Sequence, residues 1–311
     1  MSRQNTRTKP GDIVLLLMYR LFVNTIGYFP LPVIRYGCLV IFLFLYPLAG
    51  LLFGLRRRVA RNLRAAYRDA LTIHESKTIA RRALYNQLLF FMELFFYYHP
   101  RNKRVLKESI SIEGIENLAA ARQRSRGVIG VSGHLGNFQL MMLRLSLEDG
   151  RFAALIKNPK SRILSDAWIK YMDDFGLRTI MIRNRVSATK QIIRELKRSA
   201  FVMFIADEFT RRGGYVVTFF GKKTCMAAGP ARLSLKMDIP LLPCFIIRED
   251  TGRYRIIIEP AVEIAGSGDY EVDCLAVTQK RIDILERYIR QYTDQWLWTQ
   301  TRWKKKILRE Q

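Results

Sequence analysis

The sequence contains few histidines, few cysteines and few acidic residues. Four cysteines are scattered without the close spacing of a zinc site or a disulfide framework: Cys38, Cys225, Cys244 and Cys274. They suit a reducing compartment, and we expect all four to be structural. The sequence implies no metal or redox cofactor. Only three histidines occur in 311 residues.

Negative charge is scarce: 27 aspartates and glutamates face 52 lysines and arginines, a formal net charge of +25 at pH 7. Such an excess indicates a polyanionic partner, which could be a nucleic acid, an anionic membrane surface or an acidic carrier protein. We recognise no nucleic-acid-binding module, internal repeat or low-complexity linker. We therefore predict an anionic membrane lipid or glycolipid as partner, and no nucleic acid.

One stretch lacks charge altogether. Residues 36–55 read YGCLVIFLFLYPLAGLLFGL, about the 20 residues needed to cross a bilayer. Pro47 and Gly50 interrupt the run, so a single span, a kinked span and a re-entrant hairpin all remain possible. We predict one anchoring span that is not cleaved as a signal peptide. Five arginines within residues 56–64 follow it, and such flanks mark the cytoplasmic side, although the N-terminus is also basic.

The remaining pattern predicts a basic helical region and an α/β core. Apolar residues at helical spacing predict an amphipathic helix over residues 56–82, with a second, apolar helix over 83–98. From residue 105, short β-rich runs alternate with helical stretches, which indicates a mixed sheet flanked by helices. The expected strands are 110–112, 128–131, 152–156, 179–182, 201–206, 241–247 and 254–258. The expected helices are 161–175, 188–198, 228–236 and a long basic, Trp-rich one over 270–298. The expected division is therefore an anchor (1–55), a basic amphipathic region (56–104) and an α/β core (105–311).

His134 is the main candidate for a catalytic residue. Residues 127–139 read GVIGVSGHLGNFQ, in which a buried strand is followed by a glycine-rich turn, and Asn137 can cap the next helix. Ligands of open α/β sheets bind beyond the carboxyl ends of strands, so a general base at this turn could reach a substrate. The alternative is a histidine that serves only as a hydrogen-bonded loop residue.

Several motifs are distributed along nearly the whole chain: Asn62-Leu63, HLGNFQ at 134–139, Asn158-Pro159, residues 183–207, Phe219-Phe220-Gly221, Gly229, Pro243 and the QWLW…RWK block at 295–304. In these motifs the chain resembles the late acyltransferases of lipid A biosynthesis (lauroyl and myristoyl transferases) and their relatives that acylate phosphatidylinositol mannosides, within the lysophospholipid-acyltransferase-like superfamily. It implies a glycerolipid-acyltransferase-like fold at the cell inner membrane, with the catalytic domain on the cytoplasmic face. It also implies transfer of a fatty acyl group from a thioester to a hydroxyl or amine of a membrane glycolipid or phospholipid such as a lipid A precursor, with His134 as general base.

Gln139 departs from the family's signature, which carries an aspartate or glutamate five positions after the histidine. A carboxylate there would accept the imidazole's other N–H, fix its tautomer and stabilise the imidazolium. Three interpretations follow: an enzyme slowed because Gln139 orients the ring without a charge, a site in which Asp207 or Glu208 replaces the missing carboxylate, or a relative that kept the fold and lost the chemistry. We predict an acyltransferase; the alternative is a non-catalytic membrane-surface lipid-binding protein.

Further candidate residues surround this histidine. Asp207 ends a strand and resembles the family's acidic position, although it could simply cap the next turn. The predicted substrate-binding residues are Asn137, Lys157, Arg183, Arg211 and Arg212. Lys157 or Arg183 would hold a phosphate or neutralise an oxyanion, and the 211–214 loop could contact phosphate. A solvated surface role is the alternative for any single cation.

The basic surface also suggests the acyl donor. Acyl carrier protein is acidic and would be attracted to it, so we favour this donor over acyl-CoA. Near the C-terminus, three tryptophans interleave with cations, which predicts an aromatic and basic patch at the membrane interface. These tryptophans are Trp296, Trp298 and Trp303.

Overall fold

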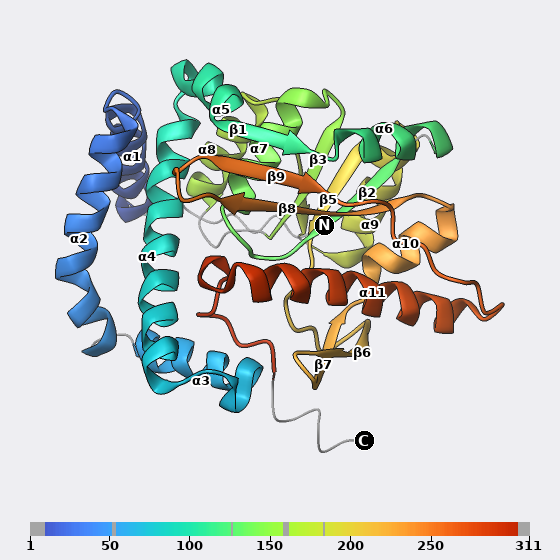
Figure 1. Ribbon diagram of the computed structural model, residues 1–311. Helices are drawn as coiled ribbons and strands as arrows, with labels where there is room; N and C mark the ends of the chain where they lie inside the picture. Colours follow the sequence, from blue (N-terminus) through green and yellow to red (C-terminus); the bar gives the residue numbers. More distant parts are fainter. Residues whose placement is uncertain (1–9, 52–53, 126, 158–161, 183, 304–311) are drawn as a thin grey trace.

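The computed structural model describes residues 10–51, 54–125, 127–157, 162–182 and 184–303, in which N-terminal helices pack beside an α/β unit (Figure 1). The N-terminal helices are α1 (Pro10–Ile26), α2 (Leu31–Leu51), α3 (Leu55–Tyr67) and α4 (Ile73–Tyr98). The later helices are α5 (Lys103–Ser109), α6 (Ile115–Arg124), α7 (Phe138–Glu148), α8 (Arg162–Asp173), α9 (Arg185–Lys197), α10 (Gly229–Met237) and α11 (Tyr270–Gln291). Short 3₁₀ turns are η1 (Arg68–Ala70), η2 (Pro100–Asn102) and η3 (Thr293–Gln295).

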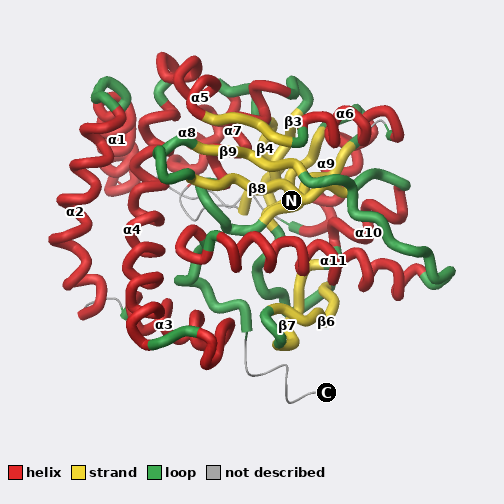
Figure 2. Tube along the Cα trace, in the orientation of Figure 1, coloured by secondary structure: helices red, strands yellow, loops and turns green. Residues whose placement is uncertain are grey.

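A mixed sheet, drawn in yellow in Figure 2, forms the centre. It has seven strands in the order β1-β9-β8-β2-β5-β3-β4. The strands are β1 (Ile110–Glu113), β2 (Val128–Ser132), β3 (Phe152–Lys157), β4 (Arg178–Ile182), β5 (Phe201–Ile205), β8 (Leu241–Arg248) and β9 (Tyr254–Ile258). Neighbouring strands are parallel except in the β8–β9 hairpin. The expected mixed α/β sheet flanked by helices is therefore confirmed. A separate hairpin, β6 (Gly214–Phe219) and β7 (Lys222–Ala227), was not predicted.

The sheet is covered on both faces. Cys244 and Ile246 of β8 belong to the same core cluster as the apolar residues of α7. Phe245 and Ile247, which alternate with them, pack with residues of α11 in a second cluster. Burial on both faces explains why the central strands read as continuous apolar runs.

The N-terminal region differs from its prediction. The expected helix over residues 56–82 is interrupted: α3 ends at Tyr67, and α4 starts at Ile73 and continues to Tyr98, so it includes the expected helix over 83–98. Arg68 has a positive φ of 49°, and Thr72 is extended and forms a capping box with Glu75. These two features end one helix and start the next, because a left-handed residue breaks the helix and the capping box satisfies the free N–H groups of the new one.

The C-terminal region also differs. The long helix ends at Gln291, and the chain continues as an irregular segment, which we call the C-terminal strap (residues 292–303). Trp296 forms an isolated antiparallel bridge with Leu135. Trp296 and Trp298 are fully buried, and Trp296 packs on Phe219 and Phe220, so the predicted interfacial patch is wrong for these two tryptophans.

Candidate active site

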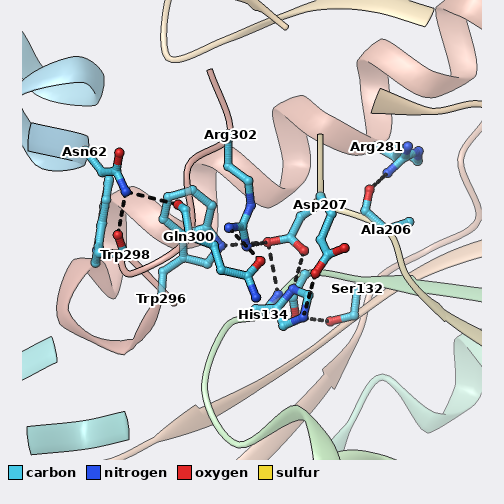
Figure 3. Close-up of polar contacts among 12 residues, drawn as sticks. Asn62, Ser132, His134, Ala206, Asp207, Arg281, Trp296, Trp298, Gln300 and Arg302 are labelled. Atoms are coloured by element: carbon cyan, nitrogen blue, oxygen red, sulfur yellow. Dashed lines mark hydrogen bonds and ion pairs between the residues drawn. The ribbon is translucent and has the colours of Figure 1, made fainter. Parts of the chain in front are cut away.

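The candidate site lies where β2 and β5 end. These strands are adjacent and parallel, with Ser132 in register with Ile205, so the residues that follow them emerge at the same edge of the sheet. The Ala206 N–H donates to the Ser132 carbonyl at 2.9 Å and continues this pairing beyond the strands. His134 and Asp207 are therefore brought together although 73 residues separate them (Figure 3).

Two glycines make this approach possible. A Cβ atom at Gly133 would lie 3.2 Å from Cγ of Asp207 and 2.9 Å from a methyl group of Leu285. Gly136 has a φ of +58°, and a Cβ there would lie 2.0 Å from the carbonyl oxygen of Ile246. Only glycine tolerates such contacts and this left-handed conformation without strain, so the two glycines permit the turn that carries His134.

The imidazole of His134 is held by the carboxylate of Asp207. Nδ1 of the ring lies 2.6 Å from Oδ1, and the His134 backbone N–H donates to Oδ2 at 3.1 Å. An ionised carboxylate can only accept, so Nδ1 carries the proton and Nε2 of the neutral ring presents a lone pair. The His134 side chain remains 14% exposed, whereas the Asp207 side chain is fully buried. This arrangement can remove a proton from a bound hydroxyl or amine.

Two residues of the C-terminal strap complete the surroundings of Asp207. The Trp296 indole N–H and the Arg302 guanidinium donate to Oδ2 at 2.9 and 2.8 Å. Burial alone would raise the pKa of Asp207, but the charges of Arg302 and His134 and their hydrogen bonds hold this pKa well below its usual range. The carboxylate is therefore ionised throughout the physiological pH range.

A second buried arginine lies beside this cluster. Arg281 of α11 donates to the carbonyl oxygens of Ala206 and Ala227, at 3.0 and 2.7 Å. Burial lowers its pKa to about 10, although the charge of Asp207 acts in the opposite direction. Arg281 thus stays charged at neutral pH and secures the chain immediately before Asp207.

Gln139 does not make the contact predicted for it. It lies in the first turn of α7 and forms no hydrogen bond with the imidazole within the described part of the chain. The group that faces Nδ1 is Asp207, which corresponds to the interpretation in which another carboxylate replaces the missing one. Sequence analysis identified both aspartate and histidine as candidates, but only the adjacency of β2 and β5 pairs them.

The other carboxylate, Glu208, lies on the opposite side of the ring. Its Oε1 is 3.9 Å from Nε2 of His134, and its side chain is 45% exposed. The ring of Phe138 meets the imidazole edge to face, with 4.9 Å between centroids. Glu208 and Phe138 therefore border the space in front of Nε2.

The predicted substrate-binding residues have different positions. Asn137 is fully buried: its Nδ2 donates to the Phe90 carbonyl and its Oδ1 accepts from the Leu140 N–H, so it caps α7 and its predicted contact with substrate is not supported. Arg211 and Arg212 are exposed in the loop after Asp207. Lys157 is the last residue of β3, at the carboxyl edge of the sheet, in register with Ile182 of β4. Arg183 lies outside the described residues.

Sequence analysis missed the supporting roles of Trp296, Arg302 and Arg281. The first two stand in the C-terminal block that carries the family resemblance, but their mixed aromatic and basic character was interpreted as a membrane-facing pattern.

Throughout the described ranges, no three His, Cys, Asp or Glu side chains gather as metal ligands would.

The fold and site define an α/β protein in which a buried aspartate holds a histidine at the carboxyl edge of the sheet. The chain belongs to the bacterial lipid A biosynthesis acyltransferase family, whose sequence profile matches residues 7–305.

Several characterised proteins are similar to this chain. A phosphatidylinositol mannoside acyltransferase of Mycobacterium tuberculosis is 25% identical over 193 residues, which cover 62% of this chain and 59% of that protein. A lipid A biosynthesis palmitoleoyltransferase of Escherichia coli is 26% identical over 203 residues, covering 64% of this chain and 63% of the relative. The chain thus spans about six tenths of the length of the curated relatives that it matches.

Proposed function

We propose that this protein is a membrane-anchored acyltransferase that moves a fatty acyl group from a thioester donor to a hydroxyl or amine of a membrane glycolipid or phospholipid. The observation that carries the proposal is the His134–Asp207 pair: Asp207 engages Nδ1 of the ring, and Nε2 has no hydrogen-bond partner among the described residues. Family membership narrows the chemistry to acyl transfer. The relatives named for phosphatidylinositol mannoside and lipid A support a glycolipid acceptor.

The reaction is a direct attack on the thioester. Nε2 of His134 removes the proton from the acceptor hydroxyl or amine as its oxygen or nitrogen attacks the thioester carbonyl carbon. The tetrahedral intermediate collapses, the C–S bond breaks, and the imidazolium returns its proton to the departing thiolate. Asp207 orients the ring and stabilises the imidazolium between these steps. The acceptor hydroxyl or amine is itself the nucleophile, so the reaction requires no serine or cysteine nucleophile.

Cations near the site would serve the phosphate groups of the substrates. Arg211 and Arg212 lie in the loop after Asp207 and are exposed. Lys157, at the same edge of the sheet, and Arg183 remain candidates for neutralising the oxyanion or binding an acceptor phosphate. Single charge reversals at these four positions would separate acceptor binding, seen in KM, from oxyanion stabilisation, seen in kcat.

The outer surface of α1 and α2 is the proposed membrane anchor. The segment Leu31–Leu48 is long and apolar enough to cross a bilayer, and only 17% of it is buried. Large apolar side chains project outward. Among them, Leu21, Tyr36 and Phe44 are 69%, 70% and 75% exposed. An exposed apolar surface of this kind is typical of membrane contact. We place the anchor in the inner membrane and the α/β unit on its cytoplasmic side.

A lipid comparison in cells tests the proposal. Lipids would be analysed by mass spectrometry from cells with the native gene, without it, with His134→Ala, and with His74→Ala as the control. His74 is an exposed histidine in α4, remote from the site in sequence. We expect one lipid species to lose one acyl group in the deletion and in His134→Ala, but not in His74→Ala. A His134→Ala lipid profile equal to wild type, with lipid binding retained, would favour the non-catalytic lipid-binding alternative.

The donor is tested separately with purified protein. If acyl carrier protein is the donor, attraction between its acidic surface and this basic protein makes its KM rise with salt. Acyl-CoA, assayed in parallel, provides the comparison. Equal use of both donors, with no effect of ionic strength, would contradict the carrier protein as the preferred donor.

A further inference from the structure

The C-terminal strap is built into the candidate site at several points. The Leu297 N–H donates to the His134 carbonyl at 3.0 Å, and the Gly136 N–H donates to the Gln295 carbonyl at the same distance. These bonds fix the backbone on both sides of the catalytic turn. The strap therefore holds both the turn that carries His134 and, through Trp296 and Arg302, the carboxylate that orients its ring (Figure 3).

The strap is itself anchored by distant parts of the chain. Asn62 of α3, which is buried, donates to the carbonyl oxygens of Trp298 and Gln300, at 2.6 and 3.1 Å. Thr224 of β7 donates to the Arg302 carbonyl at 2.6 Å. These contacts place the Arg302 side chain, which is 1% exposed, directly against Asp207.

The charge of Asp207 is already compensated in this cluster. Arg302 is positive and donates to the negative Asp207, so this carboxylate has a direct counterion even when His134 is neutral, whereas Arg281 bonds only backbone carbonyls. If the guanidinium were removed, the buried carboxylate would have His134 as its nearest possible counterion, and low polarity strengthens that attraction. That attraction would favour the imidazole that holds a proton on both nitrogens, a form that cannot act as a base. Arg302 opposes the second protonation of His134, because it supplies Asp207 with a positive charge and a hydrogen bond.

We infer that Arg302 is a positioning residue of the active site, which keeps Asp207 ionised and oriented while leaving His134 neutral and able to accept a proton. The inference rests on the proposed role of His134 as general base. The other charged groups that face the pair are Glu208, 3.9 Å from Nε2, and Arg281, which bonds the carbonyl before Asp207. Neither of them touches the Asp207 oxygens.

The pH dependence of acyl transfer tests this role, because a purely structural arginine would not affect it. With Arg302→Met, we expect kcat at pH 7 to fall by about 100-fold. The acid limb of the profile should move up by about one pH unit or more, since a neighbouring cation shifts such titrations by this amount. Asp207→Asn, which removes the anion instead, should move the acid limb down. Arg302→Lys restores the charge and should return the limb close to its wild-type position.

Arg144→Met is the matched control. Arg144 is also a buried arginine, but it bonds the Ile110 carbonyl and Glu148, away from the pair. We expect it to lose stability with an unchanged acid limb. An acid limb in Arg302→Met that coincides with that of the control would overturn the inference.

A milder variant covers the case in which Arg302→Met does not fold. Trp296→Phe removes the other strap donor to Oδ2 while keeping an aromatic ring in the core, and it should give a smaller shift in the same direction as Arg302→Met. No shift in folded Trp296→Phe would overturn the inference in that case. Full activity of His134→Ala would instead overturn the proposed base, an outcome that the Arg302 variants do not share.

Discussion

Two regions depart from the usual rule that apolar side chains are buried and charged ones exposed. They are the outer surface of α1 and α2 and the cluster around Asp207. Apolar side chains such as Phe44 are exposed on the helices, whereas Asp207, Arg281 and Arg302 are buried beside the sheet. Exposed apolar patches and buried charges are both costly, so each marks a place where something other than stability is served. The apolar surface lacks a covering partner within the described residues, whereas Asp207 is paired with Arg302 and Arg281 bonds two backbone carbonyls inside the protein.

Another buried charge connects α2 to the α/β unit. Glu93 of α4 is fully buried and pairs at 2.6 Å with Arg35, which lies on α2 between residues of the exposed surface. Tyr254 of β9 donates a hydrogen bond to the same carboxylate, and Arg248 of β8 lies 3.9 Å from it. α2 is therefore fixed to the α/β unit by a polar contact. Its own residues Ile34, Cys38 and Phe42, on the inner side of the helix, are buried.

The largest expected effect is on the catalytic pair. Asp207→Asn preserves the shape of the side chain but removes its charge, and kcat should fall by about 10³ to 10⁴, as in a protease triad changed in the same way. Acyl-transfer rates measured at several pH values test this, with Glu108→Gln, an exposed carboxylate paired with Arg104, as the control. A kcat within threefold of wild type would show that the buried charge is not needed.

The same substitution has a consequence for stability in acid. The folded pKa of Asp207 is depressed, so its contribution to stability is fully present above the unfolded pKa, near 4, and is lost as the pH falls towards the folded value. We expect the free energy of unfolding of the wild type to decrease below about pH 5 more steeply than that of Asp207→Asn. Denaturant titrations between pH 3 and pH 7 measure the difference. Parallel curves would argue against an ion pair at this position.

The next effect concerns the buried ion pair that connects α2 to the rest of the protein. Glu93→Gln leaves Arg35 without its buried partner, and removing one member of such a pair costs about 3 to 5 kcal/mol. Glu108→Gln is the control, because its ion pair with Arg104 is exposed and should contribute little to stability. Chemical denaturation in detergent measures both. Equal losses would mean that the Arg35–Glu93 contact does not secure α2.

A smaller effect is expected at the apolar surface. Phe44→Asp puts a charge at a position that is 75% exposed on α2, which should weaken membrane binding by about 2.5 to 3.5 kcal/mol if this face enters the bilayer. Vesicle flotation measures the bound fraction. Ile73→Asp, at an equally exposed position at the start of α4, is the control and should bind as wild type does. Unchanged flotation of Phe44→Asp would exclude this surface as the anchor.

The smallest effect is expected at Gln139. Because Asp207 already faces Nδ1, Gln139→Ala should change kcat by less than about threefold, the usual range for substitutions outside a critical contact. The same acyl-transfer assay measures this change beside Asp207→Asn. A loss at Gln139 as large as that at Asp207 would restore Gln139 as the residue that orients the ring.

Much of the fold could be predicted because its signals are local. Apolar runs and helical periodicity depend on residues close together in the chain, and they located each strand of the central sheet. The β6–β7 hairpin was missed because its strands mix polar and apolar residues, as in KKTCMA. The break between α3 and α4 was missed because it depends on one left-handed residue, Arg68, for which the sequence carries no strong signal.

The sequence by itself determined the alternation of strands and helices, the apolar N-terminal helix and the turn that carries His134. Only the tertiary structure decided which carboxylate meets this histidine and what the C-terminal tryptophans do. The reason is that Asp207 reaches His134 through the pairing of β2 with β5, and Arg302 reaches Asp207 from 95 residues further along. Contacts over such separations depend on the packing of the whole sheet, which local patterns of residues do not encode.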